Sequence, residues 1–180
     1  MASERLVKDL IRPLDQYFHV KDDDTIRAAL RLLDKASQEK RPLCLIVIDH
    51  EDPEKEIIRG FVTPREVIFG LTTRFLRGAE KSGPIFWEGQ LEAECLDGFD
   101  KKVAEIMAPI KAYARESEML MEAVFLLHTY NEDFLPVASE QEVVGTIHVH
   151  DIFKEIMKLA SEVASKEQKA SAGVAVPDNQ

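Results

Sequence analysis

Residues 63–66, Thr-Pro-Arg-Glu, have the residue types of a site for an anionic ligand. They follow the apolar run at 57–62 and precede a helical pattern, so we expect them where a strand turns into a helix. The first turn of a helix presents unpaired N–H groups and a partial positive charge, which attract phosphate, and Arg65 adds a cation whose planar fork matches phosphate oxygens. The alternative is a capping box with Pro at the first helical position, which stabilises a helix by about 1 kcal/mol without any ligand. The sequence leaves both interpretations of Thr63 and Glu66 open.

A second strand-to-helix turn carries His148, His150 and Asp151. A phosphate near His150 would favour the protonated form of its imidazole. Asp151 near a helix start is also favourable through the helix dipole alone, which is the alternative to a ligand contact. The spacing of the two histidines puts both imidazoles on one face of a strand, as in a metal site. The turn into the helix breaks that geometry and no third ligand lies nearby in the sequence, so we expect no metal site.

The other charged clusters favour structural roles. The acidic run at 22–24 precedes a helical pattern and is expected to be solvated charge at the helix start. The segment 51–56 is typical of a polar hairpin turn, and His50 is expected to be hydrogen-bonded or exposed. The glycine-rich nucleotide fingerprints and the G-x-S-x-G motif do not occur, and no nucleophile with its base, or pair of acids, can be assembled. We therefore expect that the protein is not an enzyme.

The composition is that of a folded globular protein. The 180 residues are 45% hydrophobic and 31% charged, with a net charge of −10 that disfavours nucleic acid as a partner. Two cysteines do not make a disulfide framework, and Cys44 lies in an apolar run typical of a buried strand. No apolar signal segment occurs at the start and no run approaches the length of a membrane helix, so we expect a cytoplasmic protein without a membrane partner.

The sequence contains an internal repeat. Residues 7–13 (VKDLIRP) and 103–109 (VAEIMAP) share the first Val, an acid at the third place, two apolar residues after it and a Pro at the seventh place. A Tyr stands four residues after each Pro, at Tyr17 and Tyr113. A unit this short has difficulty burying its apolar faces alone, so we expect the two copies to pack together.

Each copy predicts the same order of elements, strand-helix-strand-strand-helix. Short apolar runs predict buried strands at 43–48, 57–62, 134–137 and 143–147, and apolar residues at helical spacing predict amphipathic faces at 26–33, 67–75, 120–127 and 152–159. We expect a first repeat at 7–77, an ordered connector at 78–102, a second repeat at 103–164 and a flexible tail at 165–180. The connector is expected to form a short helix and to bury its large apolar side chains, Ile85, Phe86, Trp87, Leu91 and Leu96.

These features resemble a known family, the cystathionine-β-synthase (CBS) domain pair or Bateman module. The two openings, the order of the elements and the glycine-bearing strands that run into helices carry the resemblance over about residues 7–160. The text most similar to the family pattern is FLPV at 134–137 followed by VGTIHVHDI at 144–152, and the first copy gives RGFVTPREV at 59–67. The resemblance implies an α/β (α+β) fold of two tandem β-α-β-β-α CBS repeats, packed as a pseudo-two-fold pair with a helical connector.

The resemblance also implies a ligand. In this family the cleft between the repeats binds adenosine ligands such as AMP, ADP, ATP or S-adenosylmethionine. An acid at the helix start holds the ribose hydroxyls, and a Thr or Ser three residues before it meets phosphate. Asp151 then takes the ribose role and Thr63 the phosphate role, whereas Glu66 replaces the usual Asp and His148 replaces the usual Thr or Ser. The ligand-binding residues expected from the resemblance and the helix-start chemistry are Thr63, Arg65, Glu66, His148, His150 and Asp151.

Two functions follow from these expectations. The first is a regulatory module that senses an adenine nucleotide of the AMP, ADP or ATP class, requires no cofactor and signals to an effector protein that the sequence does not name. The second is a ligand-free structural or dimerisation module, which the changes at Glu66 and His148 favour. In both, the resemblance implies a homodimer formed through amphipathic helices, and the candidate faces are 67–75 and 152–159.

Overall fold

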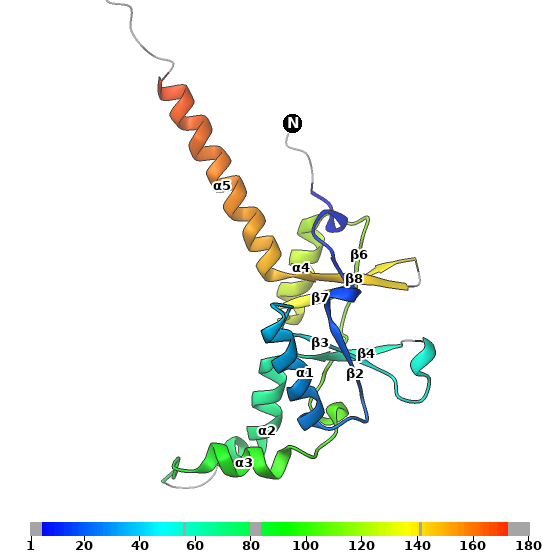
Figure 1. Ribbon diagram of the computed structural model, residues 1–180. Coiled ribbons are helices and arrows are strands. Elements are labelled where there is room, and N and C mark those ends of the chain that lie inside the picture. Colours follow the sequence, from blue (N-terminus) through cyan, green and yellow to red (C-terminus); the bar gives the residue numbers. More distant parts are fainter. Residues whose placement is uncertain (1–4, 56, 80–83, 141, 173–180) are drawn as a thin grey trace, which may run out of the picture. The chain divides into compact units, whose positions relative to one another are not determined.

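The computed structural model describes residues 5–55, 57–79, 84–140 and 142–172. The chain divides into two compact units. One unit comprises Leu14–Lys111, and the other joins the chain up to Pro13 to the part from Ala112 onward. Each unit contains one four-stranded sheet and its own buried core, and each is described by itself (Figure 1).

The unit Leu14–Lys111 has the strand order β2-β3-β4-β5. Strands β2 and β3 are parallel and connected by α1, whereas β4 is antiparallel to both β3 and β5. Its strands and α-helices are β2 (Phe18–Lys21), α1 (Ile26–Gln38), β3 (Leu45–Ile48), β4 (Ile58–Val62), α2 (Pro64–Ala79), α3 (Gln90–Gly98) and β5 (Ala108–Pro109). Short 3-10 helices occupy Leu14–Gln16, Pro53–Lys55 and Val103–Glu105.

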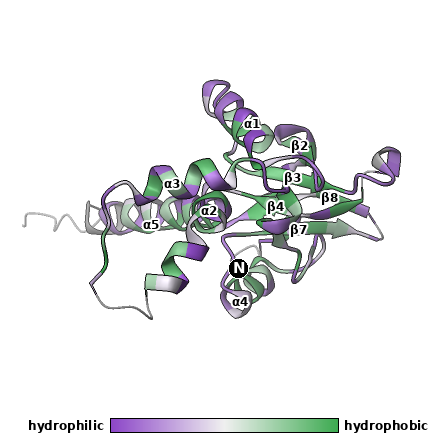
Figure 2. Cartoon of the chain, turned by 90° about the horizontal axis from the view of Figure 1, so that it is seen from below, coloured by the Kyte–Doolittle hydropathy of each residue, from purple (hydrophilic) through white to green (hydrophobic). Residues whose placement is uncertain are grey.

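The predicted apolar faces form the core of this unit. Helix α1 begins where the Thr25 hydroxyl accepts a hydrogen bond from the Ala28 N–H at 3.2 Å, a helix cap. The buried face of α1 then packs with β3, β4 and α2 around Leu45 and Val62. Cys44 is buried, as predicted, and burial raises the pKa of its thiol. Figure 2 shows the hydrophobic colour concentrated on the strands.

The second unit has the same plan, with the strand order β1-β8-β7-β6. Strands β6 and β7 are parallel and connected by α4, whereas β8 is antiparallel to both β7 and β1. Its elements are a 3-10 helix at Val7–Asp9, β1 (Arg12–Pro13), β6 (Ala114–Arg115), α4 (Leu120–Tyr130), β7 (Phe134–Ser139), β8 (Glu142–His148) and α5 (Val149–Ala172). Leu127, Leu135, Ile147 and Ile152 lie in its core.

The short opening strands complete the sheets in an exchanged manner. Strand β1, in the opening of the first repeat, pairs with β8 of the second repeat, and β5, in the opening of the second repeat, pairs with β4 of the first. These pairings bring backbones close together at Gly145 and Gly60. A Cβ at either glycine would lie 2.4 Å from a carbonyl oxygen of the edge strand, which explains why each motif strand carries a glycine.

Two features of the helices differ from the sequence-based expectations. The connector forms the predicted short helix, α3, but the prediction that its large apolar side chains are buried is wrong: Phe86 is 80% exposed and Trp87 is 63% exposed. The Trp87 ring makes an edge contact with the Phe75 ring, at 5.8 Å between ring centroids. Helix α3 instead places Gly98 against Leu71 of α2, and Cys95 packs against the core. Helix α5 continues to Ala172, so residues 165–172 of the expected flexible tail are helical, and 173–180 lie outside the described residues. Among the described helices, none has the length and apolar character needed to cross a membrane.

Candidate functional site

The start of α2 holds Thr63, Arg65 and Glu66 in a self-contained capping arrangement. The Thr63 N–H donates to Oε2 of Glu66 at 2.9 Å, the Thr63 hydroxyl donates to the same oxygen, and the Arg65 N–H donates to the Thr63 hydroxyl at 3.2 Å. The guanidinium of Arg65 lies over the Phe69 ring, 5.3 Å from its centroid. The structure therefore confirms that these residues cap the helix. The Glu66 carboxylate is engaged by the backbone and hydroxyl of Thr63 in this cap.

The start of α5 is built differently, because its acid pairs with an arginine from β1. Asp151 accepts hydrogen bonds from Nε of Arg12 at 2.5 Å and from Nη2 of Arg12 at 2.6 Å, so both carboxylate oxygens are engaged. The two side chains are only 14% and 23% exposed, and the Lys154 amine lies 3.9 Å from Asp151. Burial raises the pKa of Asp151, but the hydrogen bonds and charge of Arg12 outweigh burial, so this pKa is lowered overall. At neutral pH the site is a carboxylate held by a bidentate guanidinium.

His148 lies in the same cluster as a neutral imidazole. Its ring stacks on Phe134 with 5.2 Å between the centroids. Burial, reinforced by the charge of Arg12, lowers its pKa to about 4. The sequence-predicted residues of the second repeat are thus divided: His148 and Asp151 lie together with Arg12, whereas His150 is exposed on the first turn of α5.

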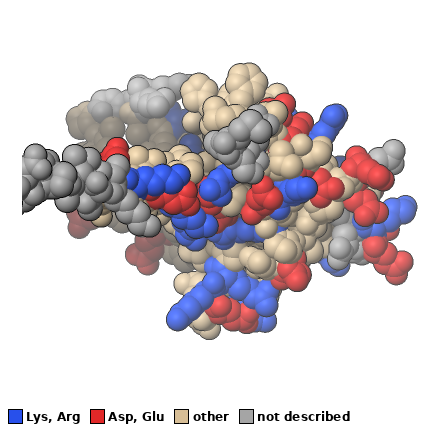
Figure 3. All heavy atoms as spheres, turned by 90° about the horizontal axis from the view of Figure 1, so that it is seen from above, with Lys and Arg blue, Asp and Glu red and all other residues tan. Residues whose placement is uncertain are grey.

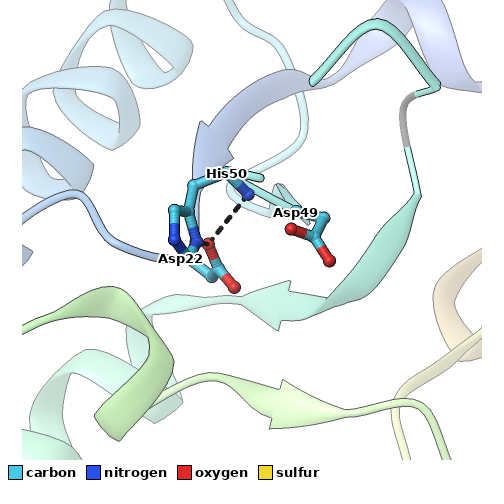
Figure 4. A group of neighbouring side chains, drawn as sticks. All are labelled: Asp22, Asp49 and His50. Atoms are coloured by element: carbon cyan, nitrogen blue, oxygen red, sulfur yellow. Dashed lines mark hydrogen bonds and ion pairs between the residues drawn. The ribbon is translucent and has the colours of Figure 1, made fainter. Parts of the chain in front are cut away.

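A third polar cluster joins the ends of β2, β3 and β4 (Figure 4). Asp22 and Asp49 are buried, and Asp22 accepts from the backbone N–H of His50 at 3.1 Å and contacts its Nδ1 at 2.7 Å. Nε of Arg59 lies 3.2 Å from Asp49 and 3.8 Å from Asp22. The expectation that Asp22 is solvated is wrong, because parallel β2 and β3 end at the same edge and bring their terminal acids together.

The charges of this third cluster are already balanced by protein groups. Burial raises the pKa of Asp22, but hydrogen bonds from His50 and the charges of His50 and Arg59 outweigh burial and lower it overall. The hydrogen bond to Asp22 raises the pKa of His50. Two carboxylates and an imidazole within 4.8 Å are a donor set for a divalent ion, but Arg59 faces both carboxylates. We therefore interpret the cluster as a structural one, whose hydrogen bonds and ion pairs hold the ends of β2, β3 and β4 together.

The two repeats and their helix starts match a known protein family. A family model described as CBS domain matches residues 7–72 and 103–158, which is more than half of the chain. The chain belongs to the CBS domain family. The predicted family and the predicted mixed α/β fold are thus confirmed.

Solved CBS structures share the fold. CBSX2 from Arabidopsis thaliana is 18% identical, with a TM-score of 0.59 over 88% of this chain and 99% of that chain. CBSX2 in complex with AMP is 20% identical, with a TM-score of 0.56 over 87% and 98%. The CBS domain pair of MJ0100, in complex with 5′-methylthioadenosine and S-adenosyl-L-methionine, is 19% identical, with a TM-score of 0.58 over 87% and 98%.

A larger protein also matches. The cytosolic domain of the Mg²⁺ channel MgtE, in complex with ATP, is 23% identical, with a TM-score of 0.54. The match covers 84% of this chain and 49% of the MgtE chain, so this chain spans about half the length of the MgtE cytosolic domain. A search of curated protein sequences found no match.

Arg12 is the member of the CBS helix-start clusters that sequence reasoning missed. It occupies the sixth place of the first opening, where the second opening has Ala108. Nothing in the local pattern links this place to residue 151, because the contact depends on the exchanged pairing of β1 with β8. Asp49 follows an apolar run, but Asp22 follows Lys21 at the end of a strand with no apolar run, so the sequence signals only one of the two acids that the parallel strands β2 and β3 bring together.

The second CBS repeat also carries an apolar groove of about 770 Å³ on α4 and α5. Phe153 is 53% exposed and Ile156 is 56% exposed on this face. The groove is lined by Arg5, Met119, Leu120, Met121, Val124, Leu127, His128, Glu132, Val149, Ile152, Phe153, Ile156 and Leu159. Charged side chains elsewhere are mixed in sign: on the face drawn in Figure 3, Lys and Arg lie among Asp and Glu.

Proposed function

We propose that this CBS chain is a regulatory, non-catalytic module that binds an adenine nucleotide at the start of α5 and passes the signal to a partner protein. The observation that carries the proposal is the Asp151 carboxylate, fixed at a helix start beside two cations, Arg12 and Lys154. A carboxylate in this position can accept hydrogen bonds from the two ribose hydroxyls. The two cations and the N–H groups of the first helical turn can bind phosphate. Structures of similar fold in complex with AMP, ATP, and S-adenosylmethionine with 5′-methylthioadenosine support this ligand class.

The two repeats have unequal roles in this proposal. Asp151 receives the ribose, while neutral His148 and exposed His150 lie on its flanks. In the first repeat, Thr63 and Glu66 are engaged with each other and Arg65 lies over Phe69, so this helix start serves mainly as a cap. We therefore assign the nucleotide to the second repeat.

Isothermal titration of the full chain with AMP, ADP, ATP and S-adenosylmethionine tests the function. We expect saturable binding of at least one nucleotide, weakened by at least about tenfold in Asp151→Asn, because the lost carboxylate made charge-assisted hydrogen bonds. The matched control is Glu162→Gln, the same change of charge at an exposed position of α5, which should leave affinity unchanged. Absence of binding by all four ligands, or equal affinity in Asp151→Asn, contradicts the proposal.

Thr63→Ala in the same titration separates a cap from a ligand contact in the first repeat. As a cap, Thr63 contributes about 1 kcal/mol to the free energy of unfolding and nothing to affinity. We expect that result. A loss of nucleotide affinity beyond the loss of stability would instead assign a ligand to the first repeat as well.

The exposed apolar face of α5 supports a second candidate function, a module that acts through dimerisation. We propose that a second copy of the chain covers Phe153 and Ile156, since contiguous exposed apolar surface marks interfaces. Phe153→Glu is expected to convert a dimer to a monomer in size-exclusion chromatography with light scattering. Ser165→Glu, on the opposite face of α5, should leave the dimer intact; a wild-type monomer at every concentration rules this candidate out.

A further inference from the structure

The two repeats differ in what covers the outer face of their helices. Leu71 of α2 and Ile156 of α5 are equivalent residues, each five places after the acid of the helix start, Glu66 or Asp151. Leu71 is 4% exposed, whereas Ile156 is 56% exposed. Helix α3 accounts for the difference, because Gly98 lies directly against the Leu71 side chain. The connector therefore covers, within the chain, a face of the first repeat that the second repeat leaves open.

The side chains around these two residues differ in the same direction. Polar residues on the helices of the first repeat are replaced by exposed apolar residues at the equivalent places of the second. The replacements are Arg27 by Met121, Arg31 by Phe125, Thr72 by Met157 and Arg74 by Leu159. In the first repeat Ile68 is exposed, but Arg65 and Thr72 lie one helical turn before and after it. Only the second repeat thus carries a contiguous exposed apolar face, the mark of an interface.

The charges around this face fit a second copy of the same face. Residues 117–133, which contain α4, include no Lys or Arg and four acids, Glu118, Glu122, Glu132 and Asp133. On α5 the side chains of Lys154 and Lys158 are 52% and 68% exposed, while the acids beside them, Asp151 and Glu155, pair with arginines of the N-terminal segment. In a two-fold dimer each contact occurs twice with exchanged roles. Packing α4 of each copy against α5 of the other sets the acids opposite the lysines in both places.

We propose that two copies of the chain associate through the second repeat alone, with α4 of each copy against α5 of the other, and that α3 excludes the first repeat from this interface. Of the two candidate faces, 67–75 and 152–159, only the second then takes part, together with α4. This inference rests on the proposed dimerisation and names the surface that the dimer uses.

A charge introduced at equivalent places of the two repeats tests the choice of face. Ile68 and Phe153 each lie two residues after the helix-start acid and are 55% and 53% exposed, so a Glu at either place disturbs the folded chain equally little. Sedimentation equilibrium of the full chain measures the dimer dissociation constant. Phe153→Glu is expected to weaken the dimer by at least about thirtyfold, the effect of losing an anchor side chain at an interface. Ile68→Glu is the matched control and should change it by less than about threefold.

Reversing the lysines of α5 tests the packing of α4 against α5. Lys154→Glu combined with Lys158→Glu sets acids against the acids of α4, so the dimer should weaken by about tenfold, and the difference should shrink at high salt. If α5 instead packs against α5, like charges already face each other in the wild type, and the reversal leaves the dissociation constant unchanged. That result overturns the proposed packing. Thermal unfolding of each variant shows that the fold is retained.

The outcomes separate this inference from the function on which it rests. If Ile68→Glu weakens the dimer as much as Phe153→Glu, both repeats take part and the role of α3 is wrong, while dimerisation stands. If neither variant weakens the dimer, the interface lies elsewhere and the inference is wrong. If the wild type is a monomer at every concentration, the proposed dimerisation itself is wrong, and the inference is wrong with it.

Discussion

Gly145→Ala is expected to lower the free energy of unfolding by about 2 to 3 kcal/mol, the cost of overpacking a rigid contact. A Cβ at this position would lie 2.4 Å from the carbonyl oxygen of Arg12 and 2.4 Å from Cγ2 of Ile11. The carbonyl belongs to the backbone of β1, which cannot move aside without losing its pairing with β8. Urea denaturation followed by circular dichroism measures the loss.

Two further glycine variants show whether the close approach is the cause. Gly60→Ala, where a Cβ would lie 2.4 Å from the Ala108 carbonyl oxygen, should destabilise the other unit by a similar amount. Gly78→Ala in α2 meets no atom within 4 Å and should change stability by less than about 1 kcal/mol, towards a more stable protein. A Gly145→Ala protein as stable as the wild type would mean that β1 does not need its observed position.

The order of the elements could be predicted from the sequence, but the partners of the shortest strands could not. Apolar runs predict β3, β4, β7 and β8, and helical spacing predicts α1, α2, α4 and the start of α5. The strands, α1 and α4 bury apolar residues of these patterns, whereas α5 leaves Phe153 and Ile156 exposed. Strands β1 and β5 are two residues long and carry no periodicity. Their exchange between the repeats is set by tertiary packing at Gly60 and Gly145, which no local pattern encodes.

The candidate site was predictable to the extent that its chemistry is local. The Thr63 and Glu66 cap follows from residues three apart, and the structure contains it. The hydrogen bond from Arg12 to Asp151 joins residues 139 positions apart and depends on the exchanged strand β1. The sequence therefore predicts Asp151 as a site residue but gives no indication that Arg12 is its partner. The apolar character of Phe86 and Trp87 predicts burial, but both precede α3 and are exposed, whereas Cys95 of α3 packs against the core.

Mild acid is expected to destabilise the second-repeat unit through His148. Burial and the charge of Arg12 lower the folded pKa of His148 to about 4, whereas the ordinary histidine pKa is about 6.5. Between these values the unfolded chain binds a proton that the folded chain does not, so stability falls as the pH falls through this window. The full difference corresponds to about 3 kcal/mol, present above pH 6.5 and lost towards pH 4. Urea denaturation at several pH values measures the slope.

His148→Phe isolates this contribution, because it keeps a ring against Phe134 and removes the titrating group. We expect the acid-side slope to flatten in this variant. His50→Gln provides a control of opposite sign: the bond to Asp22 raises the folded pKa of His50, so its contribution is present at low pH and is lost as the pH rises through that raised value. Because the two histidines act in opposite directions, His50→Gln should steepen the net loss of stability in acid. An unchanged slope in His148→Phe would mean that His148 titrates normally and that the cluster around Arg12 and Asp151 is open to water.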